Sequence, residues 1–460
     1  MFCCRSIPRE IFMRISTSQI YDAGALNIQR NQSALYKLQN QLSTGRRVLT
    51  PEDDPVAAAQ ALIVTQSQEV NAQQLENQGN ASSQLGLVDS QLSSLTDLLQ
   101  NVRERVVQAG NTGTLNNSDR QTIATELESR LGEMLGIANS QNGSGDYLFS
   151  GYQGSTLPFA INAALPAVPP ANTSPVGYFG DAGERLLQVS SSRQIAVNVS
   201  GSDVFMNAKG GNGTFVTSTG GNLIAPAGAN KGSATIDAGS VLDQQKWQLA
   251  LSGYGWSTPA NPAIQIRFSV VAGVTSYQLY DISTPATPVA ISTAASFTPG
   301  QAVPLVTTSP PAATVTDFGS QVVVHGQAAD GDTFTIKPSS SQSLFQTMQN
   351  LIGILRSPVG SASNTTSEYT NALGGQLSNL DQAFENVSRV QATVGTRMRE
   401  LDSLGDTSSD LEIQYKTTLS KLQDLDYAKA ISDFTLQKTY LEAAQQSFVK
   451  ISGMSLFNYL

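Results

Sequence analysis

Few side chains in this sequence could take part in catalysis or metal binding. The chain has one histidine, His325, and two cysteines, Cys3 and Cys4. Zinc sites and catalytic triads need several such residues brought together, and adjacent cysteines rarely form a disulfide because the geometry is strained. The sequence therefore predicts no zinc site, no triad and no disulfide framework. Carboxylates are the remaining side chains that could bind a metal ion or serve an enzyme as catalytic groups.

A charged turn near the N-terminus is better suited to ion pairing than to catalysis. A glycine is typical of the residue that follows a helix, and an aspartate before a proline is typical of the start of the next helix. One hypothesis is that its charges form ion pairs between subunits or between helices and fix the register of an assembly. The alternative is a capped surface turn with solvated charges, because exposed ion pairs contribute little. The turn motif consists of Gly45, Arg46, Arg47, Asp53, Asp54 and Pro55.

Composition excludes several classes of partner. The chain has 460 residues, a formal net charge of -9 and a sequence pI near 4.8. It therefore lacks the basic footprint of a nucleic-acid-binding protein, and an anionic membrane surface would repel it. No stretch is apolar for long enough to span a bilayer. We expect no nucleic acid, membrane or cofactor among its ligands.

The first residues make a poor secretory signal, because a charge pair interrupts them and no long apolar segment follows. Met13 begins a more natural opening, and residues 1–12 are interpreted as an upstream extension.

The chain changes character twice along its length. Both ends are polar and helix-like, whereas the middle is rich in Gly, Pro, Thr, Ser and Val. The pattern predicts an α+β multidomain protein, in which long coiled-coil helical arms from both termini flank an inserted antiparallel β-rich domain. We expect terminal assembly helices at 13–45 and 415–460, a helical bundle domain at 46–154 and 342–414, and the β-rich insert at 155–341.

Apolar residues at three- and four-residue spacing predict the helices and their contacts. Such spacing places one stripe on one side of a helix. Two stripes are expected to pack on each other as the core of the bundle within one subunit. Their members are Leu85, Leu92, Leu95, Leu99, Val102, Leu380, Phe384, Val387, Val394 and Met398.

A second set of apolar residues, seven apart, occupies the two terminal segments. An isolated polar helix is marginal in water, so we expect these segments to order only when neighbouring subunits cover the stripe. The predicted assembly seam comprises Tyr21, Ile28, Leu35, Leu38, Leu42, Tyr427, Phe434, Leu441, Phe448 and Ile451.

In the insert, short β-rich or alternating runs predict strands. They lie at 185–189, 194–199, 247–251, 264–270, 321–325 and 333–336.

Three motifs carry a resemblance to a known family. The stretch LSTGRRVLTPEDDPVAAA at 42–59 resembles the N-terminal signature of the flagellar hook-associated protein family, type 3. DYLFSGY at 146–152 is similar to the motif that ends the first helical arm of that family, and NVSRVQATVGTRMREL at 386–401 resembles a helix shared with flagellin. The resemblance covers 13–460 in outline and is weak across about 210–315.

The resemblance implies a non-enzymatic structural subunit of the bacterial flagellum. Such a protein forms a helical ring with copies of itself, between the other hook-associated protein and the first flagellin subunits. It is exported unfolded through the flagellar type III channel without a cleaved signal, with the help of an export chaperone. It acts in the extracellular flagellum.

Three other functions compete with this interpretation. Flagellin shares the arms but lacks the Thr-Pro-x-Asp-Asp-Pro form of the turn. A secreted adhesin would explain the Thr/Ser-rich middle but not the matched arms. An enzyme would have only isolated carboxylates to work with.

Overall fold

A computed structural model describes residues 17–162, 174–226, 228–253, 263–284, 287–308, 315–361 and 364–453. The expected extension 1–12 lies outside these residues. The chain divides into two compact units, Met1–Glu76 with Leu404–Leu460, and Asn77–Ser403. The long helices α2 (Pro55–Ala109) and α6 (Thr366–Gln423) contribute to both.

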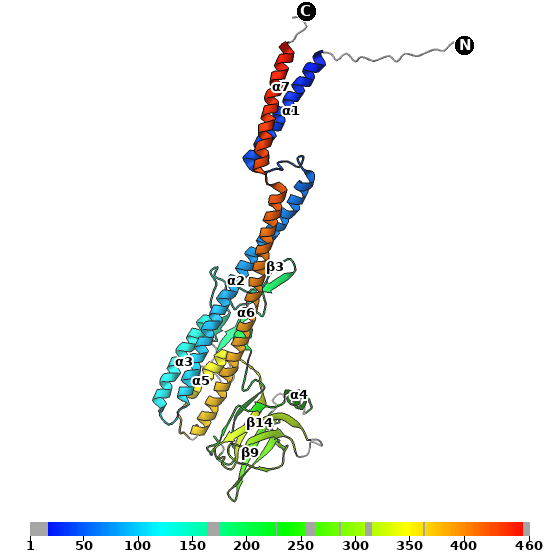
Figure 1. Ribbon diagram of the computed structural model, residues 1–460. Helices are drawn as coiled ribbons and strands as arrows, with labels where there is room; N and C mark the ends of the chain where they lie inside the picture. The colour runs from blue at the N-terminus through cyan, green and yellow to red at the C-terminus, as the bar shows by residue number, and fades with distance from the viewer. Residues whose placement is uncertain are drawn as a thin grey trace, which may run out of the picture. The chain divides into compact units, whose positions relative to one another are not determined.

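The first unit contains two terminal arms, α1 (Thr17–Thr44) and α7 (Tyr427–Gly453), which lie side by side (Figure 1). They run antiparallel, because Tyr21 at the start of α1 stacks edge-on against Phe448 near the end of α7, with 5.8 Å between the ring centroids. Farther along, Gln437 Nε2 donates a hydrogen bond of 3.1 Å to Asn31 Oδ1.

Helix ends in this unit follow the sequence signals. Helix α1 stops at Thr44, and Gly45 follows with a φ of +71°. Helix α2 starts at Pro55, and the preceding Asp54 accepts a hydrogen bond from Ala57 N. The apolar spacing slips at two places, near 404–411 and near Leu425. Helix α6 continues through the first slip, and the second coincides with the break between α6 and α7.

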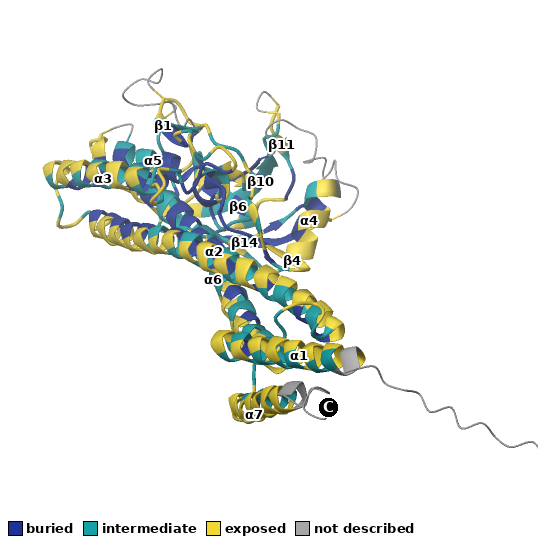
Figure 2. Ribbon diagram, turned by 90° about the horizontal axis from the view of Figure 1, so that it is seen from above, coloured by how far each residue is buried: buried dark blue, intermediate teal, exposed yellow. Residues whose placement is uncertain are grey.

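The second unit begins with a bundle in which α2 and α6 run antiparallel and α3 (Asn117–Ala138) packs on α5 (Leu344–Arg356). Buried stripes follow these helices in Figure 2. In the sequence, Ser118 followed three residues later by Gln121 predicts a capping box that opens α3. That expectation is wrong: Asn116 is the N-cap, and it exchanges hydrogen bonds with the backbone and side chain of Asp119.

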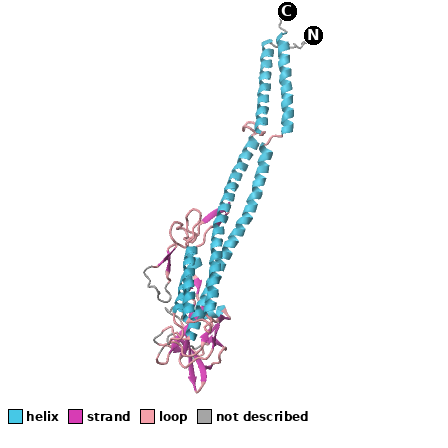
Figure 3. Cartoon of the chain, turned by 90° about the vertical axis from the view of Figure 1, so that its left-hand side faces the viewer, coloured by secondary structure: helices cyan, strands magenta, loops and turns pink. Residues whose placement is uncertain are grey.

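The strands of the β-rich insert, magenta in Figure 3, pair antiparallel throughout the described residues. Its largest sheet has the order β11 (Val289–Ala290), β10 (Val274–Asp281), β9 (Ile264–Val271), β15 (Asp332–Pro338) and β6 (Phe215–Asn222), with β12 (Ala295–Ser296) also on β10. A second sheet has the order β13 (Ala302–Val306), β14 (Asp317–His325) and β7 (Thr235–Ile236), with β8 (Ser240–Val241) also on β14.

Three strand pairs and two short helices complete the insert. The pairs are β1 (Phe159–Ile161) with β2 (Val176–Tyr178), β3 (Leu186–Ser190) with β4 (Arg193–Ala196), and β5 (Ala208–Lys209) with β16 (Ser341–Gln342). A π-helical turn, η1, spans Ser202–Met206. The predicted fold class, helical arms around an antiparallel β-rich insert, is confirmed.

One predicted strand is a helix. Residues 247–251 lie in α4 (Gln244–Gly253), whose first turn is capped by Asp243: its Oδ1 accepts hydrogen bonds from Gln245 N and Lys246 N. The β-rich residues of this run predict a strand, but the run forms a helix that buries Trp247. Trp247 is buried between Phe215 and Phe318 in the core of the insert.

Candidate functional site

The two interhelix breaks of the first unit lie next to each other. One is the turn from Gly45 to Asp54, and the other is the short break from Asp424 to Asp426. Arg47 N donates to Gln423 O at 2.7 Å, and Leu425 N donates to Gly45 O at 2.9 Å. These antiparallel bonds satisfy backbone groups that the ends of α1 and α6 would otherwise leave unpaired. We call this paired set of breaks the turn clamp.

Arg47 holds the clamp with its guanidinium. Nη1 donates to Asp54 Oδ2 at 3.0 Å, and Nη2 donates to Leu422 O at 2.8 Å. A cation at the last carbonyls of a helix is stabilised by the helix dipole, and an anion at the N-cap of α2 is stabilised for the same reason. Arg47 therefore ties the end of α6 to the start of α2. The Arg47 carbonyl accepts from Gln41 Nε2 at 2.6 Å, which fixes the turn to α1.

Asp53 organises the turn from inside. Its Oδ2 accepts from Leu49 N at 2.9 Å and from Thr50 N at 3.1 Å, and its Oδ1 pairs with Lys37 Nζ at 2.5 Å. The hydrogen bond from Lys37 and then those from the two backbone amides lower the pKa of the Asp53 carboxyl from 3.8 to about 2. Asp53 is therefore ionised in all ordinary conditions, and it holds the turn against α1.

Asp54 caps α2. The hydrogen bond from Ala57 N and then the one from Arg47 lower the pKa of the Asp54 carboxyl. Pro55 occupies the first position of the helix, where its missing N–H costs nothing. Arg46 contributes through its backbone, which forms an isolated bridge with Asp424.

Gly45 is required by two features at once. Its φ of +71° lies in the left-handed region that side chains disfavour. A Cβ atom built there would also lie 2.8 Å from the hydroxyl oxygen of Tyr427. Tyr427, the first residue of α7, thus packs directly on Gly45, which follows the last residue of α1.

The residues of the predicted seam lie on the two arms of one chain, α1 and α7. Those on α1 are all half-buried, as are Phe434, Leu441 and Phe448 on α7, whereas Tyr427 is mostly exposed. Gly24 lets the Phe448 ring approach, because a Cβ there would lie 2.7 Å from it. Ile451 belongs to α7, and its side chain lies outside the described residues. The stripe thus pairs α1 with α7, and its predicted role between subunits remains a proposal.

The ten predicted bundle-core residues lie on α2 and α6. Eight of them are buried, and Phe384 and Met398 are half-buried. Polar pairs accompany this stripe: Arg103 Nε lies 2.7 Å from Asp381 Oδ1.

Several clamp residues were missed from the sequence. Lys37 and Gln41 enter the clamp as hydrogen-bonding partners. Tyr427, predicted only as a member of the assembly seam, enters it as a packing partner of Gly45. Lys37 and Gln41 are four residues apart on α1, which places them on one side of the helix. That spacing could have indicated a shared contact surface on α1. It could not show that the partners are Asp53 and the Arg47 carbonyl.

The clamp offers ion pairs and backbone pairing but no catalytic constellation. No cluster of three or more His, Cys, Asp or Glu in the described part of the chain could hold a metal ion. Within the same residues, no helix has the length and apolar character needed to cross a membrane.

Comparison with known proteins assigns a class to this architecture. Residues 15–154 match the bacterial flagellin N-terminal helical region, and residues 377–460 match the bacterial flagellin C-terminal helical region. The chain is also 37% identical to an Escherichia coli flagellin, over 108 residues that cover 24% of this chain and 22% of that protein. The arms, the clamp and the long helices thus define a flagellin-like structural protein.

A second level of similarity extends beyond the arms. Flagellar hook-associated protein 3 of Salmonella typhimurium is 25% identical over 445 residues, which cover 97% of this chain and 99% of that protein. The crystal structure of the flagellar junction protein FlgL from Legionella pneumophila is 26% identical, with a TM-score of 0.61, and covers 79% of this chain and 100% of its own. The chain is a flagellar structural protein homologous to flagellar hook-associated protein 3.

Proposed function

We propose that this chain is a non-enzymatic subunit of the junction between the flagellar hook and filament, where copies of it form a short ring. The single observation that carries this proposal is the extent of similarity. Similarity to flagellar hook-associated protein 3 spans 97% of the chain, insert included, whereas matches to flagellins span from 24% to 50% of it. A filament subunit would not account for the match across the insert.

The arms contribute two apolar surfaces to assembly, one between α1 and α7 and one that faces outward. The half-buried stripe pairs α1 with α7, while other apolar side chains face outward. On α1 these are Leu26 and Tyr36, and on α7 they are Ile431, Leu436, Tyr440 and Val449, each about half to two-thirds exposed. Exposed apolar surface of this kind favours association. In the ring, neighbouring subunits cover these faces and thereby stabilise the paired stripe.

The turn clamp gives the arms a defined starting point. Its ion pairs and hydrogen bonds lie within one chain, and together they hold the end of α6, the start of α2 and the end of α1. A fixed origin for both arms would set the register in which neighbouring arms meet. The partners at the two sides of the ring are the other hook-associated protein and flagellin. An export chaperone accompanies the chain to the type III channel.

Gold-labelled antibody against the β-rich insert tests the proposed location on isolated flagella. A single band where hook meets filament supports the proposal. Label along the whole filament would identify a filament subunit, and label confined to the membrane side of the hook would also overturn the proposal. Antibody against flagellin provides the matched control, because it must mark the filament only.

A further inference from the structure

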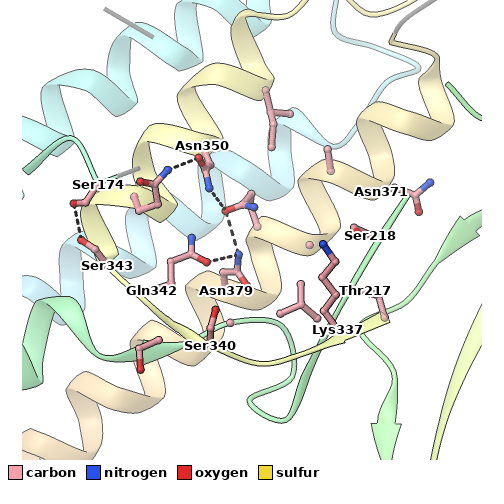
Figure 4. A pocket seen from close by; sticks show the side chains of 18 of the residues that line it. Ser174, Thr217, Ser218, Lys337, Ser340, Gln342, Ser343, Asn350, Asn371 and Asn379 are labelled. Carbon is pink, nitrogen blue, oxygen red and sulfur yellow. Dashed lines mark hydrogen bonds between the residues drawn. The ribbon is translucent and has the colours of Figure 1, made fainter. Parts of the chain in front are cut away.

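A cavity of about 740 Å³ opens in the second unit, where the insert meets the bundle. Helices α5 and α6 form one side of it, and residues of β6, β15 and β16 form the other (Figure 4). This volume falls within the roughly 300–1,000 Å³ that is typical of small-molecule sites.

The lining of the cavity mixes polar and apolar groups and is almost uncharged. Lys337 is the single charged residue among the described lining residues, which include neither a carboxylate nor an aromatic ring. Metal cations and cationic ligands therefore find no counter-charge there. Serine and threonine hydroxyls accompany a cluster of carboxamides that come from both sides of the cavity. The carboxamides are Gln342, Gln346, Asn350, Asn371, Gln376 and Asn379.

Most of these carboxamides hold one another in place. Gln346 Nε2 donates to Asn350 Oδ1 at 2.7 Å, and Asn350 Nδ2 donates to Gln376 Oε1 at 3.5 Å. Asn379 Nδ2 donates to Gln376 Oε1 at 3.2 Å and to Gln342 Oε1 at 3.3 Å. Figure 4 shows this chain of bonds crossing from α5 to α6 and on to β16. The donors and acceptors are thus ordered before any ligand arrives.

One acceptor in this network of carboxamides has no donor among the described residues. The Gln346 side chain is 4% exposed, and its Oε1 has no hydrogen-bond partner among the described residues. A buried acceptor without a donor is costly, so buried polar atoms are nearly always paired. A water molecule, or a ligand that supplies an O–H or N–H group at this position, would remove the cost.

The strand edge at the cavity is closed to a peptide. Strand β6 is the last strand of its sheet, and an extended peptide could in principle pair with such an edge. However, the Thr217 carbonyl oxygen lies 3.9 Å from the position of a Cβ at Gly375 on α6. The helix therefore covers the edge, and a ligand with its own hydrogen-bonding groups fits better than a strand.

We propose that this cavity binds a neutral saccharide of one or two rings. Saccharide hydroxyls both donate and accept, as do the carboxamides that line the site, and one hydroxyl would donate to Gln346 Oε1. The apolar side chains of Val216 and Ile354, which also line the cavity, would contact the C–H faces of the sugar. This site is independent of the proposed assembly role, because it lies away from the arms and clamp in sequence and uses none of their residues.

Binding is tested on the full-length chain with glucose, maltose, trehalose and N-acetylglucosamine at millimolar concentration. Isothermal titration measures affinity, and hydrogen–deuterium exchange measures protection at 342–350 and 371–379. Gln346→Met removes the amide while keeping the length of the side chain, and Ala372→Phe fills the cavity. Gln349→Met is the matched control, because Gln349 lies on the same helix but does not line the cavity.

We expect at least one probe to bind the wild-type chain and to slow exchange in both segments. Gln346→Met should weaken that binding roughly tenfold, which corresponds to the loss of one good hydrogen bond. Ala372→Phe should abolish it, and Gln349→Met should leave it unchanged. Absence of binding by every probe would overturn the proposal. So would equal binding by all variants, or binding of a glycine–serine peptide in place of the sugars.

Discussion

Arg47 donates a hydrogen bond of 2.8 Å to the carbonyl oxygen of Leu422, although 375 residues separate the two in the sequence. The same guanidinium pairs with Asp54 at the start of α2. One side chain therefore joins the departing end of one long helix to the beginning of the other. The point where the terminal arms begin is fixed by this contact and by the backbone bonds around it.

Arg47→Lys should loosen the arms without unfolding the protein. A lysine cannot reach both Asp54 and Leu422 with the fixed geometry of a guanidinium, and an exposed ion pair contributes only about 0.2–1 kcal/mol. We expect faster amide exchange across 427–453 and little change in the thermal midpoint. Arg46→Lys is the control, because the Arg46 guanidinium takes no part in the clamp. Equal exchange in the two variants would mean that Arg47 does not hold the arms.

Gly45→Ala should destabilise the first unit. The left-handed backbone costs a side chain about 1–2 kcal/mol, and the added Cβ would collide with the Tyr427 hydroxyl. Gly86→Ala, in the open interior of α2, should instead stabilise by about 0.4–1 kcal/mol. Urea unfolding of the two variants measures both effects, and a Gly45→Ala protein as stable as the wild type would contradict the described turn.

Asp53 gives the first unit a specific dependence on acid. Its pKa is lowered in the fold from 3.8 to about 2, so its ionised form contributes stability above the unfolded pKa. That contribution is lost as the pH falls from about 4 to about 2. Asp53→Asn should be less stable at neutral pH, and its stability should fall less over that interval. Asp433→Asn, an exposed substitution on α7, should follow the wild-type curve in urea titrations at each pH.

Leu95→Ala should cost about 3 kcal/mol of unfolding free energy, because Leu95 is buried in the α2–α6 core and leaves a cavity when shortened. Leu87→Ala, on the same helix but 42% exposed, should cost less than about 1 kcal/mol. Chemical denaturation of the paired variants measures the difference. Equal losses would show that the two faces of α2 are not distinguished by packing.

Periodicity predicted the helical parts well because one physical cause controls them. Stripes such as Leu85 to Val102 must be covered, and antiparallel α2 and α6 cover each other. The end of α1 and the start of α2 could also be predicted, since Gly45 and Asp54-Pro55 satisfy local backbone requirements. These signals act over a few residues and need no knowledge of distant contacts.

Predictions failed where a distant contact or a weak local preference decided the outcome. The run at 247–251 forms a helix because Asp243 caps it and Trp247 fills the core of the insert, a role that only the assembled sheets define. The stripe on α1 contacts α7 of the same chain, a pairing that a spacing of seven residues could not specify. Its packing against neighbouring subunits stays a prediction. The carboxamide cavity also could not be predicted, since its lining comes from segments far apart in the sequence.

Deletion of the gene, followed by electron microscopy of the cells, tests the central claim most directly. The account predicts completed hooks without filaments, with flagellin released into the medium. Filaments should return with the full-length chain and not with a chain truncated before Tyr427. Cells that carry normal filaments after the deletion would contradict the claim that this protein joins hook to filament.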